Sequence, residues 1–252
     1  MLNINKEIMK KIIKCLIIVI ILTIGYLYRL SAKNNSINTA SSKINRVSEI
    51  KVNYTFYDPT FEKFSDEEKR KALFYTKLPG DIVYGNEDAK VIVINFFNYN
   101  CYYCKEFEKT VFNDLKTNYI DKGLIKLVYR PLDSKATILM TSSLVCLRDE
   151  TVADKIHKEF FNLENKRNKT LESFILDSIR KYKNIPEDNV LSECILNQSQ
   201  LEQLVYLQNN NRRYFNIKGT PKFVINGKEF DGFLKYKKLS SLIDEELNKE
   251  TK

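Results

Sequence analysis

Two cysteines separated by two residues, Cys101 and Cys104, are the part of the sequence best suited to chemistry. Such a Cys-x-x-Cys pair can supply half of a zinc site, a structural crosslink or a redox centre. A zinc site needs further ligands at short spacing, but the other cysteines stand alone and His157 is the single histidine. His157 itself is expected to be a partly exposed packing residue on a helix. The sequence therefore favours a redox pair and predicts no metal site.

The residues around the pair predict how the two thiols are positioned. Residues 91–97 are a short, largely apolar run rich in β-branched residues, which is typical of a central strand buried on both faces. After Cys104, apolar residues such as Phe107 and Val111 recur at helical spacing. Cys101 would then lie at a helix N-terminus, where free N–H groups and the helix dipole favour a reactive thiolate. Cys104, one turn later, would lie deeper and could close the disulfide or resolve a mixed one.

The other predicted elements give an α/β order with no internal repeat. Residues 65–68 form a capping box that starts a helix, and Asn226-Gly227 predicts a tight hairpin turn. Strands are expected over 124–129 and on both sides of that turn, and helices over 134–147, 152–161, 171–182, 200–215 and 236–247. Strand, helix, strand, helical block, hairpin and helix together predict an α/β sheet with a helical insertion.

The first 32 residues predict a membrane leader. Three lysines within positions 10–14 precede an apolar run that ends at Arg29. The run is at the short end of the roughly 20 residues that a spanning helix needs. Residues 30–32 match a cleavage site poorly, so a cleaved signal peptide and an uncleaved signal anchor both stay open. Either leader would carry the rest of the chain across the membrane, where disulfides can form.

The positive charge of the chain does not indicate nucleic-acid binding. Residues 1–33 hold six basic residues and one acidic residue, which leaves +4 of the net charge of +9 for the remaining chain. There, basic and acidic residues are interspersed, as at 66–70, and this mixture is typical of a solvated helix face. The sequence has no Gly-rich nucleotide loop, and we expect no nucleic-acid partner and no bound cofactor.

Two segments of the chain resemble the DsbA-like branch of the thioredoxin superfamily, whose bacterial, exported members transfer disulfides to other proteins. The first is residues 85–105, which include Cys-Tyr-Tyr-Cys, and the second is residues 217–227, which include Thr220-Pro221. The resemblance covers about residues 80 to 250 and implies a thioredoxin-like fold with a helical insertion at about 133–212. It implies a leader at 1–32, a spacer and helical lead-in at 33–80, and a thioredoxin-like domain at 81–251.

The resemblance also assigns roles to residues of both segments. Cys101 and Cys104 correspond to the redox-active disulfide of the family. Pro221 corresponds to a cis proline that lies against this disulfide, and a cis bond is a costly feature that is rarely accidental. Thr220 corresponds to the residue before it, whose backbone would pair with an extended substrate peptide.

A second pair of cysteines lies in the expected helical insertion. Some DsbA-like proteins carry a structural disulfide between helices there, which implies a Cys146–Cys194 bond in this chain. A crosslink of that span would stabilise the fold by about 4 kcal/mol in the chain-entropy model. The alternative is two buried free thiols.

The sequence departs from the family pattern at two places. Asn95 stands six residues before Cys101, where the family often has a buried acid that can take the proton of the resolving thiol. Tyr102 and Tyr103 stand between the cysteines, where strongly oxidising members carry a histidine. Because tyrosine supplies no positive charge to a thiolate, we expect a milder oxidant with a Cys101 pKa above about 3.5.

The resemblance implies an oxidase that forms disulfides in exported proteins, working in the periplasm or at the extracytoplasmic face of the membrane. Its partners would be unfolded or reduced exported proteins and a membrane protein that reoxidises it. An uncleaved leader would hold it in the inner membrane. A disulfide isomerase or reductase remains an alternative, as does a binding module or metallochaperone on the same fold, because fold alone does not fix function.

Overall fold

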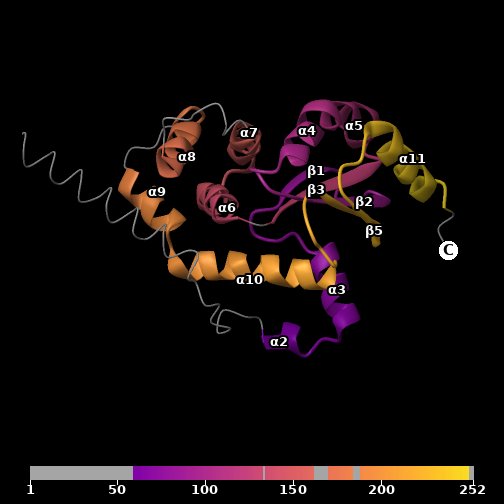
Figure 1. Ribbon diagram of the computed structural model, residues 1–252, viewed down its shortest axis with the longest axis horizontal. Coiled ribbons are helices and arrows are strands. Elements are labelled where there is room, and N and C mark those ends of the chain that lie inside the picture. Colours follow the sequence, from indigo (N-terminus) through magenta and orange to yellow (C-terminus); the bar gives the residue numbers. More distant parts are fainter. Residues whose placement is uncertain (1–58, 133, 162–169, 184–187, 250–252) are drawn as a thin grey trace, which may run out of the picture. The chain divides into compact units, whose positions relative to one another are not determined.

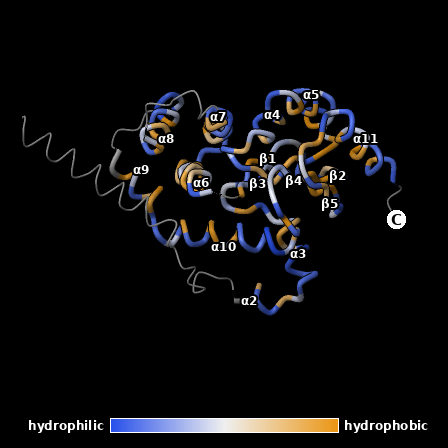
Figure 2. The backbone as a smooth tube through the Cα atoms, viewed as in Figure 1, coloured by the Kyte–Doolittle hydropathy of each residue, from blue (hydrophilic) through white to orange (hydrophobic). Residues whose placement is uncertain are grey.

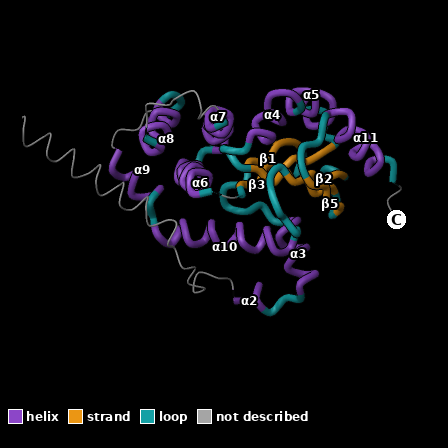
Figure 3. Tube along the Cα trace, in the orientation of Figure 1, coloured by secondary structure: helices purple, strands orange, loops and turns teal. Residues whose placement is uncertain are grey.

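The computed structural model describes residues 59–132, 134–161, 170–183 and 188–249 (Figure 1). Within these residues a five-stranded sheet has helices on both of its faces (Figure 3). The predicted leader and most of the predicted spacer fall in residues 1–58, outside the described part. In the described ranges, no helix has the length and hydropathy needed to cross a membrane.

The sheet has the strand order β1-β3-β2-β4-β5, with β2 at its centre as predicted. Only β2 and β3 run parallel, and all other neighbours are antiparallel. A parallel pair needs a crossover connection, which here is formed by the helices that follow the cysteine pair. The strands are β1 (Ile82–Gly85), β2 (Val91–Phe97), β3 (Ile125–Pro131), β4 (Lys222–Ile225) and β5 (Lys228–Asp231).

The helices lie close to their predicted positions. The capping box is present: the Ser65 hydroxyl accepts from the Glu68 N–H, and the Glu68 carboxylate accepts from the Ser65 N–H. The described helices are α2 (Pro59–Glu62), α3 (Asp66–Tyr75), α4 (Tyr102–Thr110), α5 (Phe112–Leu115), the π-helix η3 (Lys116–Ile120), α6 (Lys135–Leu147), α7 (Glu150–Phe160), α8 (Leu171–Arg180), α9 (Asp188–Ile195), α10 (Gln198–Tyr214) and α11 (Tyr236–Leu247).

One face of the sheet packs against α3 and α10 through an apolar core. Hydrophobic residues alternate with hydrophilic ones along α10 (Figure 2), so that helix has an apolar side to bury. Arg130 at the end of β3 is buried on this side, and its guanidinium lies 2.7 Å from the Asp81 carboxylate. The buried core residues are Leu73, Phe74, Ile94, Phe96, Val128, Leu132, Phe215, Ile217 and Val224.

The other face of the sheet lies under α4, α5 and α11 (Figure 1). Alternate residues of a strand point to opposite faces, so Asn95 and Phe97 point away from the core that contains Ile94 and Phe96. Helices α6 to α10 occupy the chain between β3 and β4, where the insertion is expected, and α6 contacts α7, α8, α9, α10 and the end of β3.

Three elements differ from the sequence prediction. Strand β1 is too short to give a periodic pattern, and it forms because it pairs antiparallel with the outer edge of β3. Helix α9 is not among the helices predicted from the sequence. The predicted single helix after Cys104 ends at Val111, and α5 and the π-helix η3 continue it.

Candidate active site

Cys101 lies where the loop after β2 becomes α4. It is the N-cap residue of α4, and its sulfur accepts a hydrogen bond from the Cys104 N–H at 3.2 Å. The same sulfur lies 3.2 Å from the carbonyl oxygen of Thr220 and donates to it as a thiol. Cys101 is partly exposed, so an external disulfide can reach it.

The surroundings of Cys101 favour its thiolate. The pKa of Cys101 is lowered to about 6, first by the hydrogen bond from the Cys104 side chain and further by contacts with Thr220 and the backbone of α4. Partial burial opposes this shift because it disfavours the charged form. A pKa of about 6 leaves most of the sulfur as thiolate at neutral pH, and thiolate is the attacking species in disulfide exchange.

Cys104 has the opposite character. Its side chain is buried, with 1% of its surface exposed. Burial raises the pKa of Cys104, and the hydrogen bond that it donates to Cys101 raises the pKa further. Both cysteines are free thiols in this structure. The pair can therefore carry out a two-step exchange. Cys101 reacts with the external sulfur, and Cys104 forms the internal disulfide or is released from it.

The second predicted segment lies directly against this pair. Thr220 and Pro221 are joined by a cis peptide bond just before β4. The contact between the Cys101 sulfur and the Thr220 carbonyl joins two segments that are 119 residues apart in the sequence. The structure thus brings together the four residues Cys101, Cys104, Thr220 and Pro221.

Two exposed aromatic residues follow Cys101 directly in the sequence. Tyr102 and Tyr103 are 65% and 56% exposed, and their ring centroids are 5.3 Å apart. Phe233, in the loop after β5, stacks on Tyr103 with 6.0 Å between the ring centroids. Neither residue between the two cysteines adds positive charge.

Asn95 lies on the β2 face that α4 covers. Its side chain is completely buried, between Tyr129 of β3 and Phe223 of β4 in the register of the sheet. Neither polar atom of its amide has a hydrogen-bond partner among the described residues. An amide cannot act as a base towards a thiol, so a proton acceptor must be another group.

His157 differs from its prediction, because it is wholly buried rather than partly exposed. Helix α7 inserts it between Phe97, Tyr129 and other rings, and its Nδ1 lies 2.7 Å from the Tyr99 hydroxyl. Burial lowers the pKa of His157 to about 3, so the ring is neutral at physiological pH. His157 thus connects the helical insertion to the loop that precedes Cys101.

A second connection from the insertion reaches the same loop. The Thr137 hydroxyl of α6 accepts from the Tyr99 N–H at 3.3 Å and donates to the Asn98 side-chain oxygen at 3.1 Å. That oxygen also accepts from the Asn100 N–H at 2.7 Å. Side chains of the insertion therefore help to define the backbone that leads into Cys101.

Glu108 is a partly buried acid near the active pair that was not predicted from the sequence. This residue lies four positions after Cys104 on α4, is partly buried, and accepts a hydrogen bond from the Tyr129 hydroxyl at 2.7 Å. Burial raises the pKa of Glu108 to about 6. The available signal was an acidic residue next to Phe107 on the apolar side of the predicted helix.

The second cysteine pair lies in the helical insertion. Cys146 of α6 and Cys194 of α9 are joined by a disulfide, with an S–S distance of 2.10 Å and Cα atoms 6.0 Å apart. The Gln200 side-chain amide lies 3.4 Å from the Cys146 sulfur. Across the described ranges, no group of three or more His, Cys, Asp or Glu residues could hold a metal ion.

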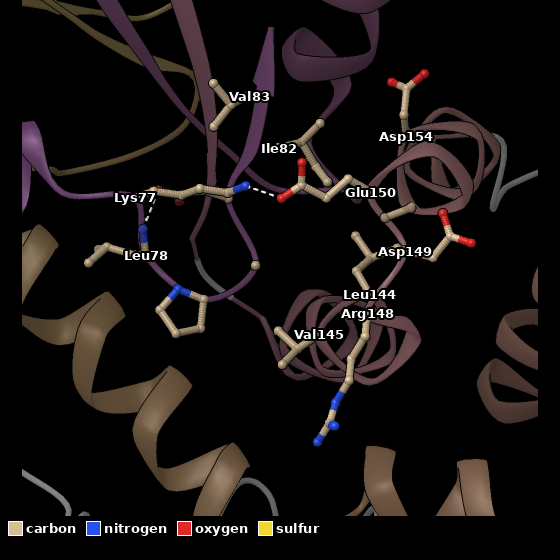
Figure 4. A pocket seen from close by; sticks show the side chains of 14 residues that line it. Lys77, Leu78, Ile82, Val83, Leu144, Val145, Arg148, Asp149, Glu150 and Asp154 are labelled. Carbon is tan, nitrogen blue, oxygen red and sulfur yellow. Dashed lines mark hydrogen bonds and ion pairs between the residues drawn. The ribbon is translucent and has the colours of Figure 1, made fainter. Parts of the chain in front are cut away.

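A cavity of about 320 Å³ lies between the loop before β1 and the ends of α6 and α7, and neither Cys101 nor Cys104 lines it. Figure 4 shows Lys77 paired with Glu150, whereas Arg148 and Asp154 point in different directions. Because these charges do not converge on a common point, the cavity lacks the polar arrangement that a small-molecule site needs.

Comparison with known proteins places the chain in a family. A family model described as Thioredoxin matches residues 77–245. A protein of Rickettsia prowazekii that carries the name protein-disulfide oxidoreductase is 27% identical over 197 residues, covering 75% of this chain and 71% of the relative. Disulfide bond formation protein D of Bacillus subtilis is 23% identical over 175 residues, covering 68% of this chain and 78% of that protein.

Solved structures share the fold. The crystal structure of oxidised BdbD from Bacillus subtilis matches with a TM-score of 0.60 at 23% identity, covering 69% of this chain and 96% of BdbD. Wolbachia pipientis alpha-DsbA1 matches with a TM-score of 0.60 at 20% identity, covering 73% and 96% of the two chains. The chain therefore belongs to the thioredoxin family and is a protein-disulfide oxidoreductase, and its fold is that of DsbA-type proteins.

Proposed function

We propose that this protein forms disulfide bonds in exported proteins by dithiol–disulfide exchange at Cys101 and Cys104. The observation that carries the proposal is the contrast between the two thiols, since the partly exposed Cys101 has a lowered pKa and the buried Cys104 a raised one. This contrast directs external attack to Cys101 and reserves Cys104 for the internal step.

The oxidation of a client proceeds in two exchanges. A client thiolate attacks the Cys101 sulfur of the oxidised pair, forms a mixed disulfide and expels Cys104, which takes up a proton. A second client thiolate then attacks the client sulfur of that mixed disulfide and expels the Cys101 thiolate. The client gains one disulfide, and the pair is left as one thiolate and one thiol.

The backbone next to Pro221 provides a place for the client chain. The Thr220 carbonyl already lies at the Cys101 sulfur, so an extended client segment that pairs with Thr220 would bring its own sulfur to Cys101. The exposed rings of Tyr102 and Tyr103 would contact apolar client residues on the other side of the thiol.

The proposed location follows from the leader. Residues 1–32 would direct the chain across the membrane or hold it there, with the domain on the extracytoplasmic side. Because each turnover leaves the pair reduced, a membrane redox partner would have to reoxidise it.

Oxidative refolding of a reduced, unfolded ribonuclease tests the proposal. The oxidised full-length protein in stoichiometric amounts should generate client disulfides and become reduced at Cys101 and Cys104. The variant Cys101→Ser should be inactive, and a Cys146→Ala/Cys194→Ala variant should retain the activity. Failure of the oxidised wild-type protein to transfer its disulfide would refute the oxidase assignment.

A reductase or isomerase is the second candidate, and one observation favours it. The Cys101 pKa of about 6 lies closer to the value of about 7 in thioredoxin than to about 3.5 in DsbA, and a less stabilised thiolate makes a weaker oxidant. Reduction of insulin by the reduced protein, faster than oxidation of the ribonuclease by its oxidised form, would favour this candidate.

A further inference from the structure

Lys222 is the first residue of β4 and follows the cis Pro221 directly. Its side chain is only 1% exposed, so a charged ammonium group lies inside the protein. A buried charge is costly unless it is paired and hydrogen-bonded. Because an apolar side chain of similar volume often fills such a place without loss of stability, Lys222 calls for a role beyond packing.

The ammonium group of Lys222 has an acceptor for each of its three N–H donors. Two of the acceptors are carboxylates of β5, those of Glu229 and Asp231, and each lies 2.9 Å from the Lys222 Nζ. The third is the carbonyl oxygen of Asn216, at 3.4 Å. The Glu229 carboxylate also pairs with Arg70 of α3. The buried charge is therefore fully paired, and one of its acceptors is held from α3.

The contact with Asn216 closes the segment that carries Thr220. Asn216 and Lys222 stand at the two ends of this segment, between α10 and β4, and the hydrogen bond joins them across six residues. Asn216 has a φ of 45°, which residues other than glycine adopt uncommonly. The hydrogen bond from Lys222 thus holds the chain at the turn where it leaves α10 for the cis peptide bond.

The loop after β5 holds the other end of the same segment. The Gly232 N–H donates to the Pro221 carbonyl oxygen at 3.0 Å. Gly232 follows Asp231 directly, so the amide that holds Pro221 is next to an acid that holds Lys222. The pairing of Lys222 with Asp231 therefore joins both ends of the segment to one short stretch of the hairpin.

The residues between these two fixed ends include the one that contacts the cysteine pair. Lys218 and Gly219 are exposed, and Thr220 is partly exposed. The Thr220 carbonyl oxygen lies 3.2 Å from the Cys101 sulfur. Hydrogen bonds weaken steeply when their geometry is poor, so a client strand binds Thr220 more tightly if this backbone is held in place before the client arrives.

We propose that Lys222 is a positioning residue, whose buried and fully paired ammonium group keeps the Thr220 backbone beside Cys101 in the geometry that an extended client needs. In the sheet register Lys222 is the partner of Phe96, so its side chain lies on the face of the sheet away from α4. Lys222 therefore acts on the client through the backbone of Thr220 and Pro221. The inference rests on the proposed function, because it presupposes a client that pairs with Thr220.

A comparison of two dithiols tests the inference. The oxidised full-length protein is mixed with dithiothreitol or with an extended peptide that contains two cysteines, and the reaction is quenched in acid at intervals. Mass measurement after thiol alkylation gives the rate at which the Cys101–Cys104 disulfide is reduced. Both reagents bring two thiols to Cys101, but only the peptide has a backbone that can pair with Thr220.

In Lys222→Met the KM for the peptide should rise by about tenfold, as expected for the loss of one or two backbone hydrogen bonds to the client. The kcat with the peptide and the rate with dithiothreitol should stay within about twofold of the wild type, because both sulfurs are unchanged. Lys126→Met is the matched control, since Lys126 is a buried lysine of β3 that pairs with Glu87. It should match the wild type in both reactions.

Four results would overturn the inference. They are an unchanged KM in a folded Lys222→Met variant, an equal loss of rate with dithiothreitol, an equal rise of KM in Lys126→Met, and a wild-type rate that does not saturate with the peptide. The first would remove the role of Lys222, the second would indicate general damage to the disulfide, and the third would indicate a loss of stability alone. The fourth would mean that no bound client exists to be positioned.

If Lys222→Met does not fold, Asp231→Ala decides. It removes one acceptor of Lys222, and the Asp231 side chain is 73% exposed, so the fold should tolerate the change. The KM for the peptide should rise by about threefold with an unchanged dithiothreitol rate, and an unchanged KM would overturn the inference. A wild-type protein that the peptide does not reduce at all would instead refute the proposed function.

Discussion

The chain contains two cysteine pairs, and they differ in almost every physical respect. Only two residues separate Cys101 from Cys104. Both are free thiols, and they lie at the N-terminus of α4. Cys146 and Cys194 are 48 positions apart, are bonded to each other and join two helices of the insertion. One pair stands where the sheet meets α4, and the other crosslinks the helical insertion, which contains neither Thr220 nor Pro221.

The difference shows that the surroundings, rather than the cysteines, determine reactivity. At the first pair, hydrogen bonds lower the pKa of Cys101 while burial raises the pKa of Cys104, so the two sulfurs are chemically unequal. At the second pair, both cysteine residues are partly exposed, and the neutral side-chain amide of Gln200 lies 3.4 Å from the Cys146 sulfur. A thiol without a stabilising partner has no comparable reason to become a nucleophile.

The largest expected effect comes from removing one sulfur of the active pair. Cys101→Ser should lower the rate of insulin reduction by about a thousandfold or more, because the thiolate that attacks the external disulfide is lost. Cys146→Ala/Cys194→Ala should reduce insulin at a rate within about twofold of the wild type at a temperature where it is folded. A comparable loss of rate in both variants would contradict the claim that only the Cys101–Cys104 pair is needed for activity.

The second pair should instead show its effect in stability. Replacing both Cys146 and Cys194 by alanine should lower the free energy of unfolding by about 4 kcal/mol, since the bond closes a long loop in the unfolded chain. Urea denaturation monitored by circular dichroism measures this change. The Cys101–Cys104 disulfide closes a loop of only a few residues, so the effect of its reduction on stability should be set by thiolate stabilisation instead.

A pH profile separates the two sulfurs within the active pair. Alkylation of Cys101 by iodoacetamide should slow by about tenfold between pH 7 and pH 5, because the thiolate is protonated as the pH falls through about 6. Cys104 should stay unlabelled over the same range, since its pKa is raised and its side chain is buried. Equal labelling of the two thiols, read by peptide mass mapping, would contradict the assigned asymmetry.

The smallest expected effect concerns the residues between the cysteines. Tyr103→His should lower the pKa of Cys101 by about one unit, because an imidazolium beside the thiolate stabilises its charge. That change should raise the reduction potential of the pair by about 30 mV. Tyr103→Phe is the matched control, as it keeps the ring and adds no charge. An unchanged Cys101 pKa in the histidine variant would mean that residue 103 does not tune the thiolate.

Much of this arrangement follows from local patterns in the sequence. Strand β2 is marked by its apolar run, the capping box marks the start of α3, and Asn226-Gly227 marks the hairpin of β4 and β5. These signals are local, because each depends on residues within one or two turns of the chain. The proximity of Thr220 to Cys101 was expected only through the family resemblance, since no local pattern links residues 119 positions apart.

The polar groups behind the active pair were harder to predict. The burial of His157 depends on α7 packing over Phe97 and Tyr129, which are remote in sequence. The raised pKa of Glu108 depends on the same packing. Strand β1 is four residues long and gains its stability from pairing with β3. The burial of His157, the pKa of Glu108 and the formation of β1 all depend on tertiary contacts, which the spacing of apolar residues in the sequence does not predict.

The reduction potential of the Cys101–Cys104 pair decides whether these cysteines have an oxidising role. Equilibration of the wild-type protein with glutathione buffers, followed by thiol trapping, measures it. We expect a reversible two-electron couple between about −270 mV, the value of thioredoxin, and about −120 mV, the value of DsbA. A potential at or below about −270 mV, or a pair that does not equilibrate with glutathione, would contradict an oxidising role for these cysteines.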